Sequence, residues 1–141
     1  MISIRAALVG LFLLAVPASV GAETRDPGIG LELNKLEAVE GACRAYVVLQ
    51  NDTDAAFSAL RYDLVIFDAD GIVARRLALE TAPLVAGKTS LKVFDLAEIA
   101  CDGIGRILVN SILECTDQTG GRDDCLSLVR TTSRSDVSLI K

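Results

Sequence analysis

The chain of 141 residues contains no histidine. Histidine is the commonest metal ligand and the usual general base near neutral pH, so its absence removes both roles. The sequence also lacks a C-x-x-C motif and a G-x-S-x-G motif, which argues against a zinc ribbon, a thiol redox centre and a serine hydrolase. No methionine-rich or histidine-rich tract is present to carry copper. We therefore expect a protein that is not an enzyme and holds no cofactor.

Only one long apolar run occurs, and it lies at the N-terminus. Residues 6–16 are apolar and follow a short positive segment that contains Arg5, while Val20 and Ala22 occupy the −3 and −1 positions of a cleavage site. The run is shorter than the roughly 20 residues that span a bilayer. We predict that residues 1–22 are a signal peptide for the general secretory route, with an uncleaved anchor helix as the alternative. The protein should then be periplasmic or secreted, without stable membrane insertion after cleavage.

Basic residues are too few to form a nucleic-acid surface. The whole chain has 14 Lys and Arg against 19 Asp and Glu, and loss of residues 1–22 leaves 13 against 19, a net charge of −6. Binding to nucleic acid or to an anionic membrane requires clustered positive charge. The remaining residues suit one domain with one core.

The chain has four cysteines, Cys43, Cys101, Cys115 and Cys125. An even number in a small exported protein indicates disulfide bonds. If successive strands run antiparallel, Cys43 and Cys101 lie at the same end of the domain, whereas Cys115 lies at the other. A Cys43–Cys115 bond would have to span a strand of about 40 Å, although the Cα atoms of a disulfide lie within about 7 Å. We predict the pairs Cys43–Cys101 and Cys115–Cys125.

Residues 57–79 are predicted to form a β-hairpin, around which we expect the rest of the domain to be organised. Apolar residues alternate on both sides of the turn Asp68-Ala69-Asp70-Gly71, as expected of two strands that each bury one face. In such a turn an Asp side chain, from Asp68 or Asp70, bonds the local backbone and Gly71 takes a positive φ. The basic pair Arg75-Arg76 is typical of a solvated sheet edge that resists aggregation.

Further strands follow from the same alternation and from turn residues between them. They are expected at 31–39, 43–49, 89–96, 104–115 and 126–130. A short helical or irregular crossing is expected at 97–103, and a polar connection at 116–124. No helix is long enough to cross a parallel sheet. The fold class predicted is therefore all-β: an antiparallel, immunoglobulin-like β-sandwich of about seven strands over residues 31–130, disulfide-stapled, between a flexible lead-in (23–30) and a flexible tail (131–141).

The segment 65–71 raises an enzymatic alternative. A strand that runs into Asp-x-Asp-Gly resembles the nucleophile loop of haloacid-dehalogenase-type phosphatases, in which the first Asp attacks phosphorus and Mg²⁺ assists. Here Ile72 follows where that family has Thr and a helix, and the rest of the chain is too short for that fold. A calcium site in this loop is disfavoured because the loop is too short to supply six to eight oxygen ligands. A metal-assisted hydrolase using Asp68 and Asp70 remains the alternative function, and a small-ligand carrier is the second alternative.

A family resemblance extends from Leu49 to Phe94. It comprises a polar turn at 51–53, an apolar strand that ends in an acidic turn and Gly over 62–71, and an L-x-x-G loop at 84–87. In these features the segment resembles secreted bacterial immunoglobulin-like modules of the FxLYD type. The triplet that begins at Asn51 also matches a glycosylation acceptor, but we interpret it as a turn. The resemblance implies a non-enzymatic module.

We therefore expect a binding or scaffolding module of the cell envelope, whose partner is an unknown envelope protein. Its binding surface should be an exposed sheet edge or the loops, because an edge strand offers free backbone N–H and C=O groups. The strand expected at 126–130, or its neighbour, is the candidate edge.

Overall fold

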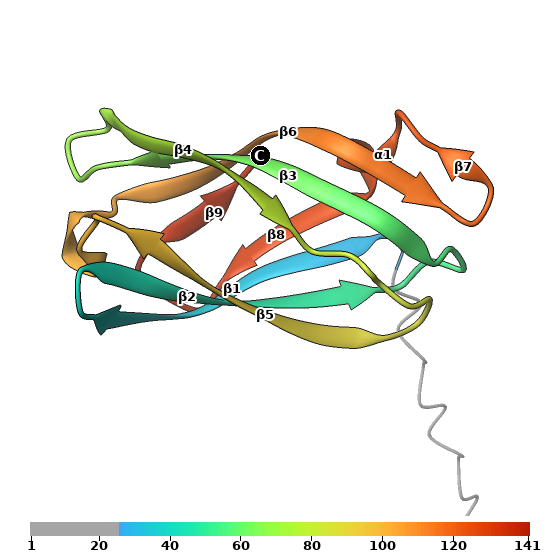
Figure 1. Cartoon of the computed structure of the whole chain (residues 1–141), viewed down its shortest axis with the longest axis horizontal. Coiled ribbons are helices and arrows are strands. Elements are labelled where there is room, and N and C mark those ends of the chain that lie inside the picture. Colours follow the sequence, from blue (N-terminus) through green and yellow to red (C-terminus); the bar gives the residue numbers. More distant parts are fainter. Residues whose placement is uncertain (1–25) are drawn as a thin grey trace, which may run out of the picture.

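The computed structural model describes residues 26–141, which form two β-sheets packed face to face (Figure 1). The four-stranded sheet has the order β5-β2-β1-β8, with β1 (Ile29–Val39), β2 (Ala42–Asn51), β5 (Thr89–Ala97) and β8 (Val129–Ser133). The second sheet has the order β4-β3-β6-β7 with β9 also paired to β6, and comprises β3 (Phe57–Phe67), β4 (Val73–Glu80), β6 (Arg106–Asp117), β7 (Gly120–Gly121) and β9 (Ser138–Ile140). A 3₁₀ helix, η1 (Cys101–Gly103), precedes β6, and a one-turn helix, α1 (Cys125–Leu128), precedes β8.

The core lies between the two sheets and follows the alternation seen in the sequence. Every second residue of β2 is buried, from Cys43 to Leu49, and β3 buries Leu60, Tyr62 and Ile66 completely. Alternate side chains of a strand point to opposite faces, so these residues pack together while their neighbours face outward. The predicted all-β sandwich is confirmed.

Both predicted disulfides are present. Cys43 in β2 is bonded to Cys101 in η1, with Cα atoms 4.9 Å apart, and Cys115 in β6 is bonded to Cys125 in α1, with Cα atoms 6.5 Å apart. The first bond ties the crossing between the sheets to the start of β2, an inner strand of the four-stranded sheet. The segment 97–103, predicted to be a short helical or irregular crossing, contains η1, although its first residue still belongs to β5.

The C-terminal predictions were wrong. The strand expected at 126–130 is α1 followed by β8, and the tail expected to be flexible contains β8 and β9. β8 runs parallel to β1 and β9 runs parallel to β6, so the sheets are mixed rather than purely antiparallel. Buried Val129, Val137 and Leu139 explain the order, because each adds a side chain to the core.

Strand number and boundaries also differ from the prediction. Residues 26–141 form nine strands rather than about seven, because the polar connection at 116–124 contains β7 and the tail adds β9. β1 begins at Ile29, which is fully buried, so the flexible lead-in cannot extend to residue 30. The predicted signal peptide, residues 1–22, lies outside the described residues. Within the described part, no helix is long and apolar enough to cross a membrane.

Candidate functional site

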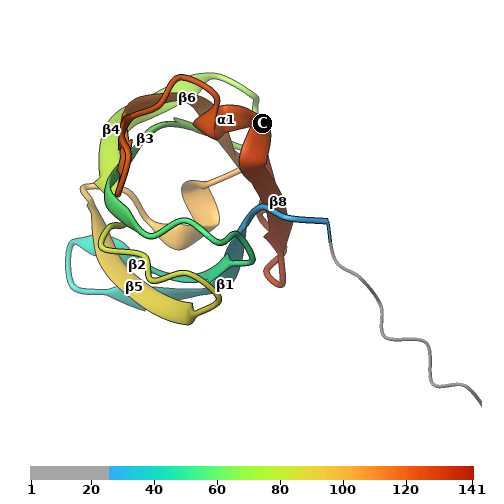
Figure 2. The same ribbon diagram turned by 90° about the vertical axis from the view of Figure 1, so that its right-hand side faces the viewer.

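The sandwich is closed on one side and open on the other. On the closed side, β8 in one sheet continues through a short turn into β9 in the other, and Ser133 Oγ donates to Val137 O across this turn at 2.6 Å. On the open side, β4 and β5 are the outermost strands of their sheets (Figure 2). The edge was predicted at residues 126–130 or the neighbouring strand. β8, which follows α1 there, is indeed an outermost strand, but it lies on the closed side, so the candidate edges on the open side are β5 and β4.

Hydrogen bonds at the two ends of β5 show which backbone groups remain free. Asn51 N donates to Lys88 O at 3.0 Å, and Glu98 N donates to Gly41 O at 2.9 Å, in register with the β2–β5 ladder. Antiparallel pairs alternate between hydrogen-bonded and non-hydrogen-bonded, so even-numbered residues of β5 bond to β2. The odd-numbered residues, Thr89 to Ala97, direct their N–H and C=O groups toward the open side.

The same odd-numbered residues place apolar side chains on the outer face. Leu91 is 55% exposed and Val93 is 47% exposed. They lie opposite Val48 and Tyr46 of β2, which are half-buried. A solvent-exposed edge strand with adjacent apolar side chains is either an aggregation hazard or a binding surface.

Lys92 lies between these two residues and points to the inner side of the strand, opposite buried Val47. It is half-buried, and its Nζ is 3.5 Å from Ala82 O. Among residues 26–141, no carboxylate lies within ion-pair distance of Lys92. A charged side chain that points inward on an edge strand would be buried by an added strand, so it disfavours pairing with an apolar strand that offers it no opposite charge.

The other free edge, β4, differs in chemistry. Thr81 N donates to Leu60 O at 3.0 Å, in register with the β3–β4 ladder, so the even-numbered residues of β4 face the open side. Its arginines are already engaged: Arg75 pairs with Glu98 at 3.3 Å and Arg76 pairs with Asp63 at 2.7 Å. The predicted basic pair therefore lies on an edge strand. β4 also exposes a large apolar side chain, Val73, at its first residue, but only β5 carries two such side chains on the residues whose backbone groups face the open side.

The acidic turn is held together by its own backbone. Asp68 Oδ1 accepts hydrogen bonds from Asp70 N at 3.0 Å and Ile72 N at 2.8 Å, and Gly71 has a φ of 80°. A residue with a side chain at that φ would be strained. In residues 26–141, no group of three or more His, Cys, Asp or Glu is arranged to hold a metal ion. The structure thus places Asp68 and Gly71 in a hairpin turn and leaves Asp70 exposed.

Asp63 is a carboxylate that the sequence analysis did not identify. Its side chain is 3% exposed, and it accepts two hydrogen bonds from Arg76, both at 2.7 Å. Asn110 and Ser111 also donate to it, at 2.7 Å and 3.2 Å, because a β-bulge at Asn110 brings both side chains to the same place. The Arg76 guanidinium and these further donors hold the pKa of Asp63 well below its ordinary value. Through these four hydrogen bonds the Asp63 carboxylate links β4, β3 and β6. The sequence feature that could have indicated such a buried polar contact is the pair Asn110-Ser111 within an otherwise apolar strand.

Asn51, the residue of the glycosylation triplet, is also an internal link. Its side chain is fully buried and donates to Ala55 O at 2.8 Å and to Val85 O at 3.2 Å. It accepts from Thr53 N at 3.1 Å. These bonds fasten the β2–β3 turn to the loop that leads into β5, so they position the edge strand.

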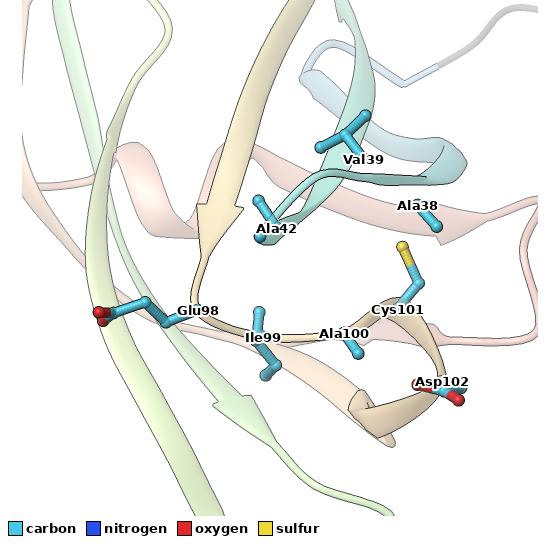
Figure 3. Close-up of a pocket in the computed structure, with 9 residues that line it drawn as sticks. Ala38, Val39, Ala42, Glu98, Ile99, Ala100, Cys101 and Asp102 are labelled. Atoms are coloured by element: carbon cyan, nitrogen blue, oxygen red, sulfur yellow. The ribbon is translucent and has the colours of Figure 1, made fainter.

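A shallow hollow lies beside the Cys43–Cys101 bond at one end of the sandwich (Figure 3). It has a volume of about 650 Å³, and small apolar residues line it, with Glu98 and Asp102 at the rim. Glu98 has a φ of 61°, which is unusual for a residue with a side chain and indicates local strain. No titratable cluster converges here, so the hollow offers shape and apolar contact rather than acid–base chemistry.

Comparison with known proteins adds information on the fold alone. Neither a protein-family model nor a curated protein sequence matches the chain. A solved structure of IrmA from Escherichia coli is similar, with a TM-score of 0.55 and 16% sequence identity over 75% of this chain and 92% of that chain. The resemblance to FxLYD-type modules stays a prediction.

Proposed function

We propose that this protein is an exported, non-enzymatic binding module of the cell envelope that takes an extended segment of a partner protein onto the free edge of β5. The observation that carries the proposal is that the N–H and C=O groups on the odd-numbered residues of β5 have no strand partner within residues 26–141, beside exposed Leu91 and Val93. An added strand would satisfy those backbone groups and bury both side chains.

Two observations support the proposed location. Both disulfides indicate an oxidising compartment, and the N-terminal segment supports export to the periplasm or the medium. If residues 1–22 are removed, N-terminal sequencing of the soluble fraction should begin at Glu23. Recovery of the full chain in the membrane fraction would contradict export by cleavage.

Photo-cross-linking in the periplasm tests the binding surface. A photoreactive residue at Leu91 should yield a discrete cross-linked product, whereas the same residue at Ala78 on the β4 edge should not. A Val93→Pro substitution removes an N–H that faces the open side and leaves the β2 ladder intact, so the product should disappear although the protein still folds. Ala78→Pro is the matched control, because it makes the same change on the other edge.

The hydrolase alternative makes the opposite prediction. If Asp68 and Asp70 carried the function, Asp68→Asn with Asp70→Asn would abolish it in a folded protein, and Val93→Pro would not. A small-ligand carrier would instead depend on the hollow beside Cys101, so it would be unaffected by both changes.

A further inference from the structure

We infer that the segment bound at β5 carries an acidic residue opposite Lys92, between two apolar residues opposite Leu91 and Val93. This inference rests on the proposed function and specifies the chemistry of its partner. The partner is an extended protein segment with the pattern apolar–acidic–apolar.

The pattern follows from the direction of the side chains on β5. Leu91 and Val93 point to the outer face, where they are about half exposed, and Lys92 points to the inner side. Residues directly opposite each other in a ladder share a face. The two outward positions of an added strand would therefore extend the apolar surface of Leu91 and Val93, and the inward position between them would meet Lys92.

Charge decides the residue at that inward position. Lys92 is half-buried, and an added strand would cover its ammonium group, whose only hydrogen bond within residues 26–141 is the 3.5 Å contact to Ala82 O. Removing an ammonium group from water is unfavourable unless an opposite charge and further hydrogen bonds replace the water. An Asp or Glu opposite Lys92 meets this requirement, whereas an apolar residue or a cation there is rejected.

A second copy of this chain meets it poorly. Two β5 strands paired about a two-fold axis at Lys92 would place two lysines opposite each other, and the register centred on Val93 would place Lys92 opposite Phe94. The register centred on Asp95 would place Lys92 opposite Glu98, but it would also place two Asp95 carboxylates opposite each other, and Glu98 lies beyond β5 and already pairs with Arg75. Each chain is also net negative, which adds repulsion between copies.

Two synthetic peptides test the inference by NMR with the oxidised, ¹⁵N-labelled protein purified from the periplasm. The first is Thr-Ala-Val-Glu-Val-Ala-Thr, and the second has Lys in place of the central Glu. We expect the Glu peptide to shift the amide resonances of Leu91 and Val93 and to bind about tenfold more tightly than the Lys peptide, because an attractive pair replaces a repulsive one. In the Lys92→Glu protein this preference should reverse.

Three results would overturn the inference. Equal binding of both peptides at β5 would show that the edge captures strands without reading charge, and the proposed function would survive. No shift of β5 amides by either peptide at millimolar concentration would count against the inference and the proposed function together. Protection of the Leu91 and Val93 amides without peptide, rising with protein concentration, would assign the edge to a second copy.

Discussion

Replacement of Asp63 by Asn should destabilise the protein by about 2–4 kcal/mol. The buried carboxylate accepts four hydrogen bonds, two of them from Arg76. An amide keeps one oxygen and turns its NH₂ group toward donors, so about two of the four bonds are lost. Each bond to a charged group contributes roughly 1.5–3 kcal/mol, but Arg76 is 64% exposed and can return to water, which reduces the loss.

Asp95→Asn is the matched control. Asp95 also receives two hydrogen bonds from one arginine, Arg44, at 2.7 and 3.0 Å, but its side chain is 44% exposed. The same substitution there should destabilise the protein far less than Asp63→Asn, because exposed ion pairs contribute little. Urea denaturation at pH 7, followed by far-ultraviolet circular dichroism, measures both. Equal losses for the two variants would refute the assignment of Asp63 as the internal link between β4, β3 and β6.

The pH dependence gives an independent measurement on the same residue. Because Arg76 lowers the pKa of Asp63 in the folded state, the unfolded chain binds this proton first as pH falls. The stabilisation is therefore complete well above the ordinary value of 3.8 and is lost as pH falls below it. The Thr119 hydroxyl lowers the pKa of Asp117 to about 2, so Asp117 also contributes stability that is lost as the pH falls. Between pH 5 and 2, the unfolding free energy of the native protein should fall more steeply than that of Asp63→Asn, and parallel curves would contradict this.

Three further predictions concern stability. Replacing Cys43 and Cys101 by Ala should cost about 4 kcal/mol from the lost loop constraint of 58 residues, and removing the shorter bridge nearer 3 kcal/mol, as measured by urea denaturation. Tyr62→Phe should leave stability unchanged or raise it by up to about 1 kcal/mol, because the buried hydroxyl has no hydrogen-bond partner among residues 26–141; a loss above 1 kcal/mol would reveal a partner. Glu98→Gly should raise the unfolding free energy by about 0.5–1 kcal/mol, because glycine adopts the positive φ without strain and the lost ion pair with Arg75 is exposed and contributes little. An unfolding free energy below that of the native protein would contradict strain at this residue.

The fold could be predicted largely because alternation and covalent geometry are local signals. The hairpin β3–β4 follows from its alternating apolar residues, and the disulfides follow from strand direction. The C-terminal strands could not be predicted, because β8 and β9 are stabilised by parallel pairing with β1 and β6, which are distant in sequence. Short strands such as Ser138–Ile140 carry too few residues for a periodic signal.

The sequence predicted a binding surface at a sheet edge near residues 126–130 or at the loops, and that surface stays a prediction, which we now place at β5. Turn chemistry explained Asp68 and Gly71. The identity of the edge strand depends on the order of the strands in the sheet. Whether the odd-numbered or the even-numbered residues of that strand have free backbone groups depends on how it pairs with its neighbour. Neither property can be read from the residues of the strand alone. Asp63 was missed because its donors come from β4 and from the β6 bulge, which only the folded sheet brings together.

Residue-resolved amide hydrogen exchange along β5 tests the central claim most directly. In the free protein, the amides of Lys92, Phe94 and Leu96 should exchange slowly because they bond to β2, while those of Leu91 and Val93 should exchange fast. When the partner captured through the Leu91 cross-link is bound, the fast amides should become protected and the alternation should disappear. Fast exchange at Leu91 and Val93 in the complex would contradict strand capture at this edge.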